Sequence, residues 1–452
     1  MYREQVMCGD AMRVNKIIGM ALLSAMSACA SYAPQPLPEH IETPNNVLAV
    51  KVDPAVQARW TTHVYDPSNG LDSEELAMLA VANNPALRAA RAQLGVARAQ
   101  AFSSGLLADP QLIFAEDFAM TPGTQNAWAY GLGFDVGDWL MRSSRQRVAQ
   151  AGVTQAEQSL LWQEWQVVNQ AKLLFVHIQT QQLLLALLYR EQQSLQAQSL
   201  LSAHALAEAN ITLEVANTDR IAWQVVTRQV DEQQRIGQQN HAQLTALLGV
   251  SPDAEVSLVG DTVLGSVDVN AVRAELTHRL NQRPDMAALR AGYAAQEAGY
   301  RATVLAQFPM FSLGLTRAQD NFGVNSIGPS FSLSVPIFNR NRGNIAVARA
   351  SREQLYQEYQ ARWLTAQSDV MLALANYTLL RQQWRTMQQD LPALQVAADA
   401  AVDAEHVGNV LGALAVRMQL AYLDKQMDVL NVRQALAEQL IALQAELGNP
   451  LP

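Results

Sequence analysis

The chain has 452 residues, of which 49% are hydrophobic and only 16% charged, and its net charge at pH 7 is −9. This length suffices for two or three ordinary domains or for one elongated domain. The acidic balance, and a sequence without any cluster of basic residues, argue against a nucleic-acid partner.

An export signal is predicted for the first 28 residues. Arg13 and Lys16 precede an apolar run of twelve residues, 17–28, which is shorter than the about 20 residues of a membrane-spanning helix. Met12 is an alternative start. The run ends in Met-Ser-Ala-Cys, which resembles the lipobox of bacterial lipoproteins and predicts an acyl lipid such as palmitate on Cys29. The alternative is an ordinary secretory signal with an incidental cysteine.

Two halves of the sequence correspond at a constant offset of 199 residues. Asn84-Pro85 corresponds to Arg283-Pro284, and Leu248-Gly249 corresponds to Leu447-Gly448. Matching prolines and chain breaks at one offset predict a duplication, each half in the order helix, strand, strand, long helix, second long helix. The predicted divisions are an extended segment at 29–70, repeat 1 at 71–249, a connector at 250–283 and repeat 2 at 284–448.

Four short segments alternate between apolar and small or polar residues. In one of them Phe331 and Leu333 alternate with Ser332 and Ser334. A period of two with one apolar face predicts strands that place this face against a non-aqueous phase. The predicted strands are 110–118, 127–139, 309–318 and 328–338.

Four strands in one chain are too few to close a membrane barrel. Two chains would give eight strands and a barrel filled by side chains, whereas three would give twelve strands and begin to leave a lumen. Small residues on the inward parity suit a wet bore. Aromatic residues near the strand ends are typical of membrane interfaces, and they are Trp128, Tyr130, Trp139 and Phe338.

Two stretches of helical composition lack both glycine and proline, at 153–236 and 344–391. They predict helices far longer than a globular core requires, which are stable only when packed side by side. Each predicted hairpin turns near a tip, at 208–211 in the first half and at 407–410 in the second.

The duplicated order, the two prolines and the strand-to-helix junction VPIFNRNRGNIAVARA (335–350) resemble the outer-membrane factor (TolC-like) family, near its lipoprotein branch of heavy-metal efflux channels. The resemblance covers 71–448. It implies a mixed α and β membrane protein, a homotrimer whose four strands per chain complete a twelve-stranded barrel in the outer membrane, with an α-helical barrel in the periplasm. It further implies the passive exit duct of a tripartite pump, whose tips dock onto a periplasmic adaptor coupled to an RND-type inner-membrane transporter. The tip residues are Val407, Gly408 and Asn409 in one hairpin, and Ala209 and Asn210 in the other.

At the periplasmic entrance the chain departs from the family pattern. Family members often carry aspartates shortly after the tip glycine, where this sequence has Leu414 and Arg417. Either apolar packing gates the entrance, or other acids charge it, or those acids only solvate helix faces. The candidate acids are Asp399, Asp403, Glu214 and Asp219.

The sequence contains no catalytic pair or triad, so we expect no enzyme. Its seven histidines are scattered without a zinc-binding spacing, and we expect no metal site and no cofactor apart from the lipid. His406, next to the tip, is more simply a solvated surface residue. The alternative function is that of a periplasmic adaptor-like lipoprotein with helical hairpins and no pore.

Overall fold

The computed structural model describes residues 32–52, 65–261, 264–407 and 412–448. Residues 44–452 form one compact unit. The described residues before it, 32–43, contain no helix or strand.

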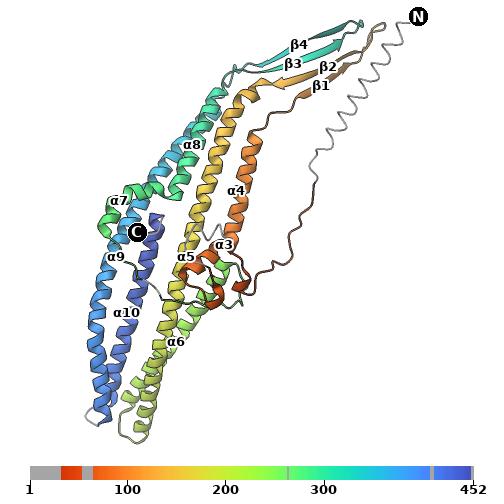
Figure 1. Cartoon of the computed structure of the whole chain (residues 1–452). Coiled ribbons are helices and arrows are strands. Elements are labelled where there is room, and N and C mark those ends of the chain that lie inside the picture. The colour runs from red at the N-terminus through yellow and green to blue at the C-terminus, as the bar shows by residue number, and fades with distance from the viewer. Residues whose placement is uncertain (1–31, 53–64, 262–263, 408–411, 449–452) are drawn as a thin grey trace. The chain divides into compact units, whose positions relative to one another are not determined.

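The two halves of this unit follow the same order of elements (Figure 1). The first half consists of α3 (Ser73–Asn83), α4 (Pro85–Ser104), β1 (Gln111–Asp117), β2 (Ala127–Asp135), α5 (Val136–Ala207) and α6 (Leu213–Leu248). The second half consists of α7 (Val269–Gln282), α8 (Pro284–Leu305), β3 (Met310–Gln319), β4 (Asn325–Ser334), α9 (Arg342–His406) and α10 (Gly412–Leu447). Two short 3₁₀ helices precede them, η2 (Val47–Ala49) and η3 (Pro67–Asn69).

Helix α3 is an element that the sequence-based order lacks. It begins at a reciprocal cap, in which Asp72 Oδ1 accepts from Glu75 N at 2.8 Å and Glu75 Oε2 accepts from Asp72 N at 3.0 Å. Its apolar residues are buried in a core shared with α5 and α6, which also receives Val47 and Val50 from the N-terminal segment. That segment was predicted to run extended over the surface, and this is wrong for these two buried residues.

Both predicted long helices are present. Helix α5 has 72 residues, which is about 110 Å at 1.5 Å per residue, and α9 has 65 with Pro392 inside it. One window of 18 residues in α5 is apolar enough for a membrane span by length and composition, and 44% of it is buried. Because α4, α6, α8 and α10 all pack along α5, we interpret this window as the core of a helical bundle.

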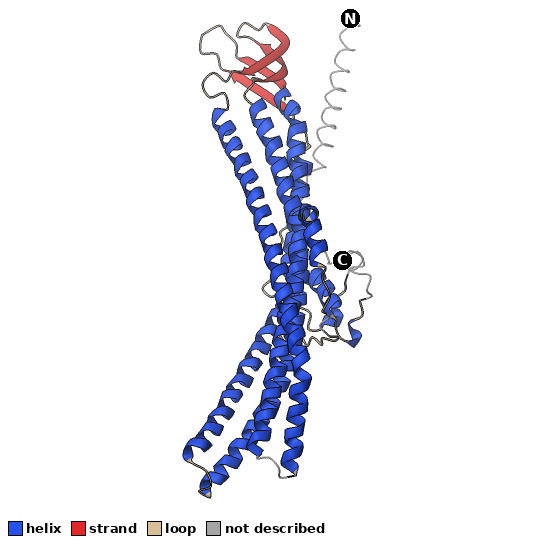
Figure 2. Cartoon of the chain, turned by 90° about the vertical axis from the view of Figure 1, so that its left-hand side faces the viewer, coloured by secondary structure: helices blue, strands red, loops and turns tan. Residues whose placement is uncertain are grey.

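The four strands form one antiparallel sheet in the order β1-β2-β3-β4. Figure 2 places the sheet at one end of the unit and the two hairpin ends, α5–α6 and α9–α10, at the other. Strand β2 ends at Asp135 and not at 139, because the Asp135 side chain accepts from Asp138 N at 3.1 Å and caps α5. Strand β4 runs from 325 to 334, so the predicted segment 328–338 is displaced toward the C-terminus.

Both halves contain the same interhelical contact next to the proline, between the residue before the proline and the end of the last helix. We call this contact the joint. Asn84 Nδ2 donates to Leu247 O at 2.9 Å, and Arg283 Nη1 donates to Glu446 O at 2.5 Å. These donors and acceptors are themselves 199 residues apart, so the offset found in the sequence is also an offset between contacts. Each joint ties the start of the second helix in its half to the end of the last one.

The joint of the second half is built on a buried ion network. Arg283 is fully buried and donates to Asp285, whose Oδ2 also accepts from Arg362 Nε at 2.9 Å. Burial alone would raise the pKa of Asp285, but the hydrogen bonds and charges of Arg283 and Arg362 outweigh it and hold that pKa below its usual value. The Trp162 ring lies 4.8 Å from the Arg283 guanidinium.

Replacing Arg283 with methionine should lower the free energy of unfolding by about 3 to 5 kcal/mol, because it removes one of the two cationic partners of Asp285, whose side chain is only 10% exposed. Urea unfolding followed by circular dichroism in detergent measures the loss. The matched control is Arg98→Met, whose exposed ion pair with Glu157 should contribute less than about 1 kcal/mol. Equal losses in both variants would contradict the role of the joint.

Candidate functional site

The sheet has one apolar face, and the strand register defines it. Leu112, Leu132 and Leu315 lie directly opposite one another across β1, β2 and β3, and Phe134 and Leu313 form part of the next row. Side chains that are directly opposite in an antiparallel sheet share a face. The alternation predicted from the sequence therefore corresponds to one continuous apolar surface, which also contains Phe114, Phe311, Ile327, Pro329, Phe331 and Leu333.

The opposite face carries small and hydroxyl-bearing residues. A Cβ atom on Gly131 would lie 3.0 Å from Thr316 Oγ1, and one on Gly314 would lie 2.5 Å from Ser330 Oγ. A side chain at Gly314 would force a neighbouring group to shift, and one at Gly131 would be tightly packed. Further residues of this face are Ala129, Gly133, Ser312, Gly328, Ser332 and Ser334, and Ile113 is an apolar exception.

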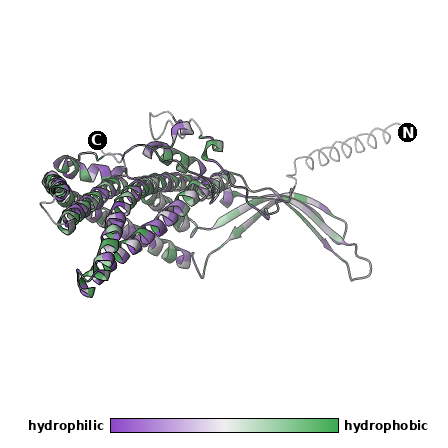
Figure 3. Ribbon diagram, turned by 90° about the horizontal axis from the view of Figure 1, so that it is seen from below, coloured by the Kyte–Doolittle hydropathy of each residue, from purple (hydrophilic) through white to green (hydrophobic). Residues whose placement is uncertain are grey.

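Within the described chain nothing covers the apolar face. Phe114 and Phe331 are 69% and 75% exposed, and the outer edges of β1 and β4 have no neighbouring strand. Burying one such side chain is worth roughly 1.5 to 3 kcal/mol, and the face has apolar residues in four successive rows, or about 20 Å along the strands. Figure 3 shows the hydropathy along the ribbon from below. An exposed surface of this size and regularity indicates contact with a non-aqueous phase or another molecule.

The four predicted interface aromatics lie near the two ends of the sheet. Trp128 and Tyr130 stack at 5.2 Å between ring centroids near the end remote from the helices, and Trp128 Nε1 donates to Gln319 Oε1 at 2.7 Å. Trp139 and Phe338 are exposed near the helical end. They lie outside the strands that were predicted to contain them, Trp139 in the first turn of α5 and Phe338 in the segment after β4.

One hairpin tip is described in full. Ala209 adopts a positive φ of 58°, and Asn210 N donates to Ala205 O at 2.8 Å. Thr212 then caps α6. Ala209 and Asn210 are exposed, as is Val407, which ends α9 at the other tip. Gly408 and Asn409 lie outside the described residues, and so does the predicted lipidation site, Cys29.

The candidate entrance residues differ in how strongly they are held. Asp219 accepts hydrogen bonds from Gln198 and Ser202 of the facing helix α5, so its carboxylate ties the two helices of the hairpin together. Glu214 lies in the first turn of α6, where a negative charge stabilises the helix. The remaining candidates are exposed on the faces of α9 and α10, and they are Asp399, Asp403, Leu414 and Arg417.

The two hairpins meet along a seam between α5 and α10. His177 Nε2 lies 2.8 Å from Glu438 Oε1, and this hydrogen bond holds the pKa of Glu438 below its usual value. Moving fourteen positions along both antiparallel helices, from 177 to 191 and from 438 to 424, leads to Glu191 and Asp424. We call these two residues the acidic layer. They lie beside the apolar cluster of Leu188, Leu195, Leu420 and Met427.

The acidic layer is electrostatically unfavourable. Glu191 Oε2 is buried without a hydrogen-bond partner, and burial, followed by the charge of Asp424, raises the pKa of Glu191. Burial and then the charge of Asp428 raise the pKa of Asp424. Sequence reasoning missed this layer because it depends on the register between two helices from different halves.

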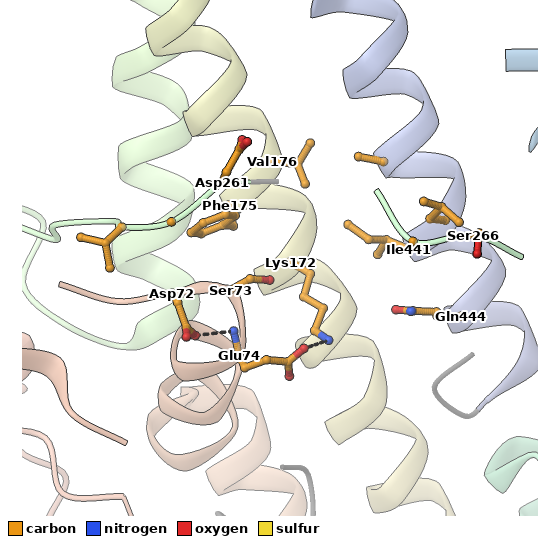
Figure 4. Close-up of a pocket in the computed structure, with 15 residues that line it drawn as sticks. Asp72, Ser73, Glu74, Lys172, Phe175, Val176, Asp261, Ser266, Ile441 and Gln444 are labelled. Carbon is orange, nitrogen blue, oxygen red and sulfur yellow. Dashed lines mark hydrogen bonds and ion pairs between the residues drawn. The ribbon is translucent and has the colours of Figure 1, made fainter. Parts of the chain in front are cut away.

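A pocket of about 580 Å³ lies between α3, α5, α10 and the connector (Figure 4). Its wall includes Phe175, Val176 and Ile441, and Lys172 Nζ reaches Glu74 Oε1 at 2.5 Å. Since this ion pair joins α3 to α5, we assign Lys172 a structural role. The described residues include no group of three or more His, Cys, Asp or Glu side chains that could hold a metal ion.

Comparisons with known proteins agree with this architecture. Residues 276–449 match the model of the family described as outer membrane efflux protein. No curated protein matches the sequence.

Among solved structures, the CmeC outer membrane channel of Campylobacter jejuni aligns with a TM-score of 0.72 at 15% identity, over 94% of this chain and 95% of CmeC. CusC aligns at 0.68 and 18% identity, over 93% of this chain and 100% of CusC. VceC, an outer membrane protein of Vibrio cholerae, aligns at 0.68 and 17% identity, over 84% of this chain and 97% of VceC. The predicted fold class, a helical body with a small antiparallel sheet of the TolC-like type, is confirmed.

Replacing Glu191 with glutamine should stabilise the protein at alkaline pH. The pKa of Glu191 is raised above its ordinary value of 4.5 in the folded state, so the folded protein binds the proton more tightly and stability falls as pH rises from 4.5 through the raised value. We expect Glu191→Gln to melt on the order of 2 °C above the wild type at pH 8, with the difference vanishing toward pH 4. Glu358→Gln, an exposed acid on α9, is the control, and a pH-independent difference would contradict the assignment.

Proposed function

We propose that this protein, which has the fold of the outer-membrane efflux channels, is the outer-membrane exit duct of a tripartite efflux pump. One observation carries the proposal: a four-stranded sheet with one apolar face, one face of small residues and two unpaired edges. In lipid, unpaired backbone groups at a sheet edge are costly, so a spanning sheet has to close. The apolar face then contacts lipid, and the face of small residues lines the bore.

Closure takes three copies. Eight strands from two copies would form a barrel that side chains fill, whereas twelve strands leave a lumen. The glycines and serines of the inner face support the wider barrel, because they leave the least side-chain volume inside it. The helical hairpins of the three copies pack into a tube on the periplasmic side, and the exposed apolar residues of α9 provide surface for this packing, among them Leu364, Leu372, Leu379 and Val396.

The duct is passive, with no chemistry of its own. A lipid on Cys29 anchors the mature chain in the outer membrane. The hairpin tips dock onto a periplasmic adaptor coupled to an inner-membrane RND-type transporter, which provides the energy. The alternative, an adaptor-like lipoprotein without a pore, would require the apolar face of the sheet to be covered within the chain, and among the described residues it is exposed.

Cysteines on the two faces of β4 should differ in their access to water. Ser332→Cys should react with a membrane-impermeant maleimide through the bore, whereas Phe331→Cys, which faces lipid, should react more than about tenfold more slowly. The assay uses the assembled protein in membranes, with Ser312→Cys and Leu313→Cys on β3 as a second pair. Equal labelling rates for the two cysteines of each pair would contradict the barrel.

A charge at the tip should uncouple docking from assembly. Val407→Asp introduces a carboxylate at an apolar side chain that is 70% exposed, so export should be lost while trimers on native gels remain. Export is measured as the resistance that the variant restores to a deletion strain, with Glu405→Gln as the neighbouring control. If the Val407→Asp variant restored wild-type resistance, the tip would not be part of the docking site.

A further inference from the structure

A shallow groove of about 640 Å³ lies over the apolar face of the sheet. All four strands contribute to it, and its aliphatic lining includes Leu112, Leu132, Leu315 and Ile327. Only one charged residue lines it, Arg317. The groove therefore combines an apolar trough with a single cation.

Arg317 interrupts the apolar parity of β3. Phe311, Leu313 and Leu315 precede it on the same face, and the register places it directly between Tyr130 of β2 and Ile327 of β4. The guanidinium is exposed and forms no hydrogen bond or ion pair with any described residue. A cation with no counter-charge on a surface that faces lipid needs an anion from the membrane.

Acidic residues of the sheet are too far away to supply that anion. Glu116 shares the face but lies two strands and one row away, which is about 12 Å at the usual strand and residue spacings. Asp117 and Asp135 lie on the opposite parity, on the face of small residues. Within this face of the sheet, the guanidinium has aromatic and apolar neighbours in its own row, and the uncharged Gln319 and Asn325 in the next row.

The position of Arg317 along β3 indicates its depth in the membrane. It lies two residues before the end of β3 at Gln319, near the end remote from the helices, and beside the stacked pair of Trp128 and Tyr130. Indole and phenol rings occupy the headgroup level of a membrane. Arg317 is thus at the height of lipid phosphates in the leaflet away from the helical body, and the groove extends from it toward the acyl region.

We infer that Arg317 and this groove bind an anionic lipid of the outer leaflet, with a headgroup phosphate on the guanidinium and an acyl chain along the aliphatic lining. Guanidinium pairs with phosphate through two parallel hydrogen bonds. The aromatic pair packs against the region between headgroup and chain. This site rests on the proposed function, because it requires that the apolar face contacts lipid.

The test is lipid binding to the purified, assembled protein in zwitterionic detergent, followed by native mass spectrometry. Phosphatidylglycerol is the probe, phosphatidylcholine the lipid without net charge, and inorganic phosphate the competitor without a chain. We expect Arg317→Gln to weaken phosphatidylglycerol binding at least tenfold and leave phosphatidylcholine binding unchanged. Arg317→Lys keeps the charge but not the two parallel hydrogen bonds, so its affinity should lie between those of the wild type and Arg317→Gln. Arg301→Gln, on the exposed face of α8, should match the wild type.

Three outcomes would overturn the site. Unchanged phosphatidylglycerol binding by Arg317→Gln would show that the guanidinium is not part of the site. Displacement of the lipid by equimolar inorganic phosphate would show that the groove contributes nothing to binding. Loss of trimers in Arg317→Gln but not in Arg317→Lys would mean that a carboxylate of a neighbouring copy, and not a lipid, neutralises Arg317. Failure of the proposed function is distinguishable from all three, because it would appear as equal cysteine labelling of the two faces in the protein with Arg317 intact.

Discussion

The structure depends on the backbone hydrogen bonds that its sheet leaves unmade. Among the described residues, β1 and β4 each pair on one side only, and the face that would contact lipid is apolar in four successive rows apart from Arg317. An open sheet edge is tolerable in water but not in hydrocarbon, where each unsatisfied N–H or C=O group costs several kcal/mol. In the proposed duct the single chain is therefore an incomplete wall, and the open edges that would make it prone to aggregate would pair with copies of itself.

In the helical body, the two long hairpins, α5–α6 and α9–α10, have to be held in one register relative to each other. Side-by-side packing of α5 against α10 does not by itself prevent sliding, since ridges of Leu, Ala and Gln offer many similar alignments. Between α5 and α10 the bond from His177 to Glu438 favours one alignment, and the contacts of Asn84 and Arg283 fix the helices within each half. The unfavourable layer of Glu191 and Asp424 lies on the same seam. A seam that contains a like-charge pair is held less tightly there than its apolar contacts alone would hold it.

Much of the fold was predictable from two sequence patterns, the alternation within the strands and the repeat of the two halves. Alternation with a period of two gave the strands, and the offset of 199 residues gave the order of the elements and matched the joints at residues 84 and 283. Helix α3 was missed although its capping pair, Asp72 and Glu75, is legible in the sequence. The end of β2 was misplaced because the alternation continues past Asp135 to Val136, and only the side-chain cap shows where the helix begins. Arg317 broke the alternation visibly, but its meaning required the register that places Tyr130 and Ile327 on either side of it.

The face of small residues also determines where selectivity can reside in the proposed duct. A bore lined by Gly131, Gly314, Thr316 and Ser330 presents hydroxyl groups and backbone, and the contacts at the two glycines disfavour a larger side chain there. Its charged residues, Asp117 and Asp135, lie at opposite ends of β1 and β2 and not along the wall. Between those two ends the wall carries no charged side chain with which a pore could discriminate between solutes. In the proposed duct, discrimination by charge therefore resides at the ends of the sheet, at the helical tips or in the partner that delivers the cargo.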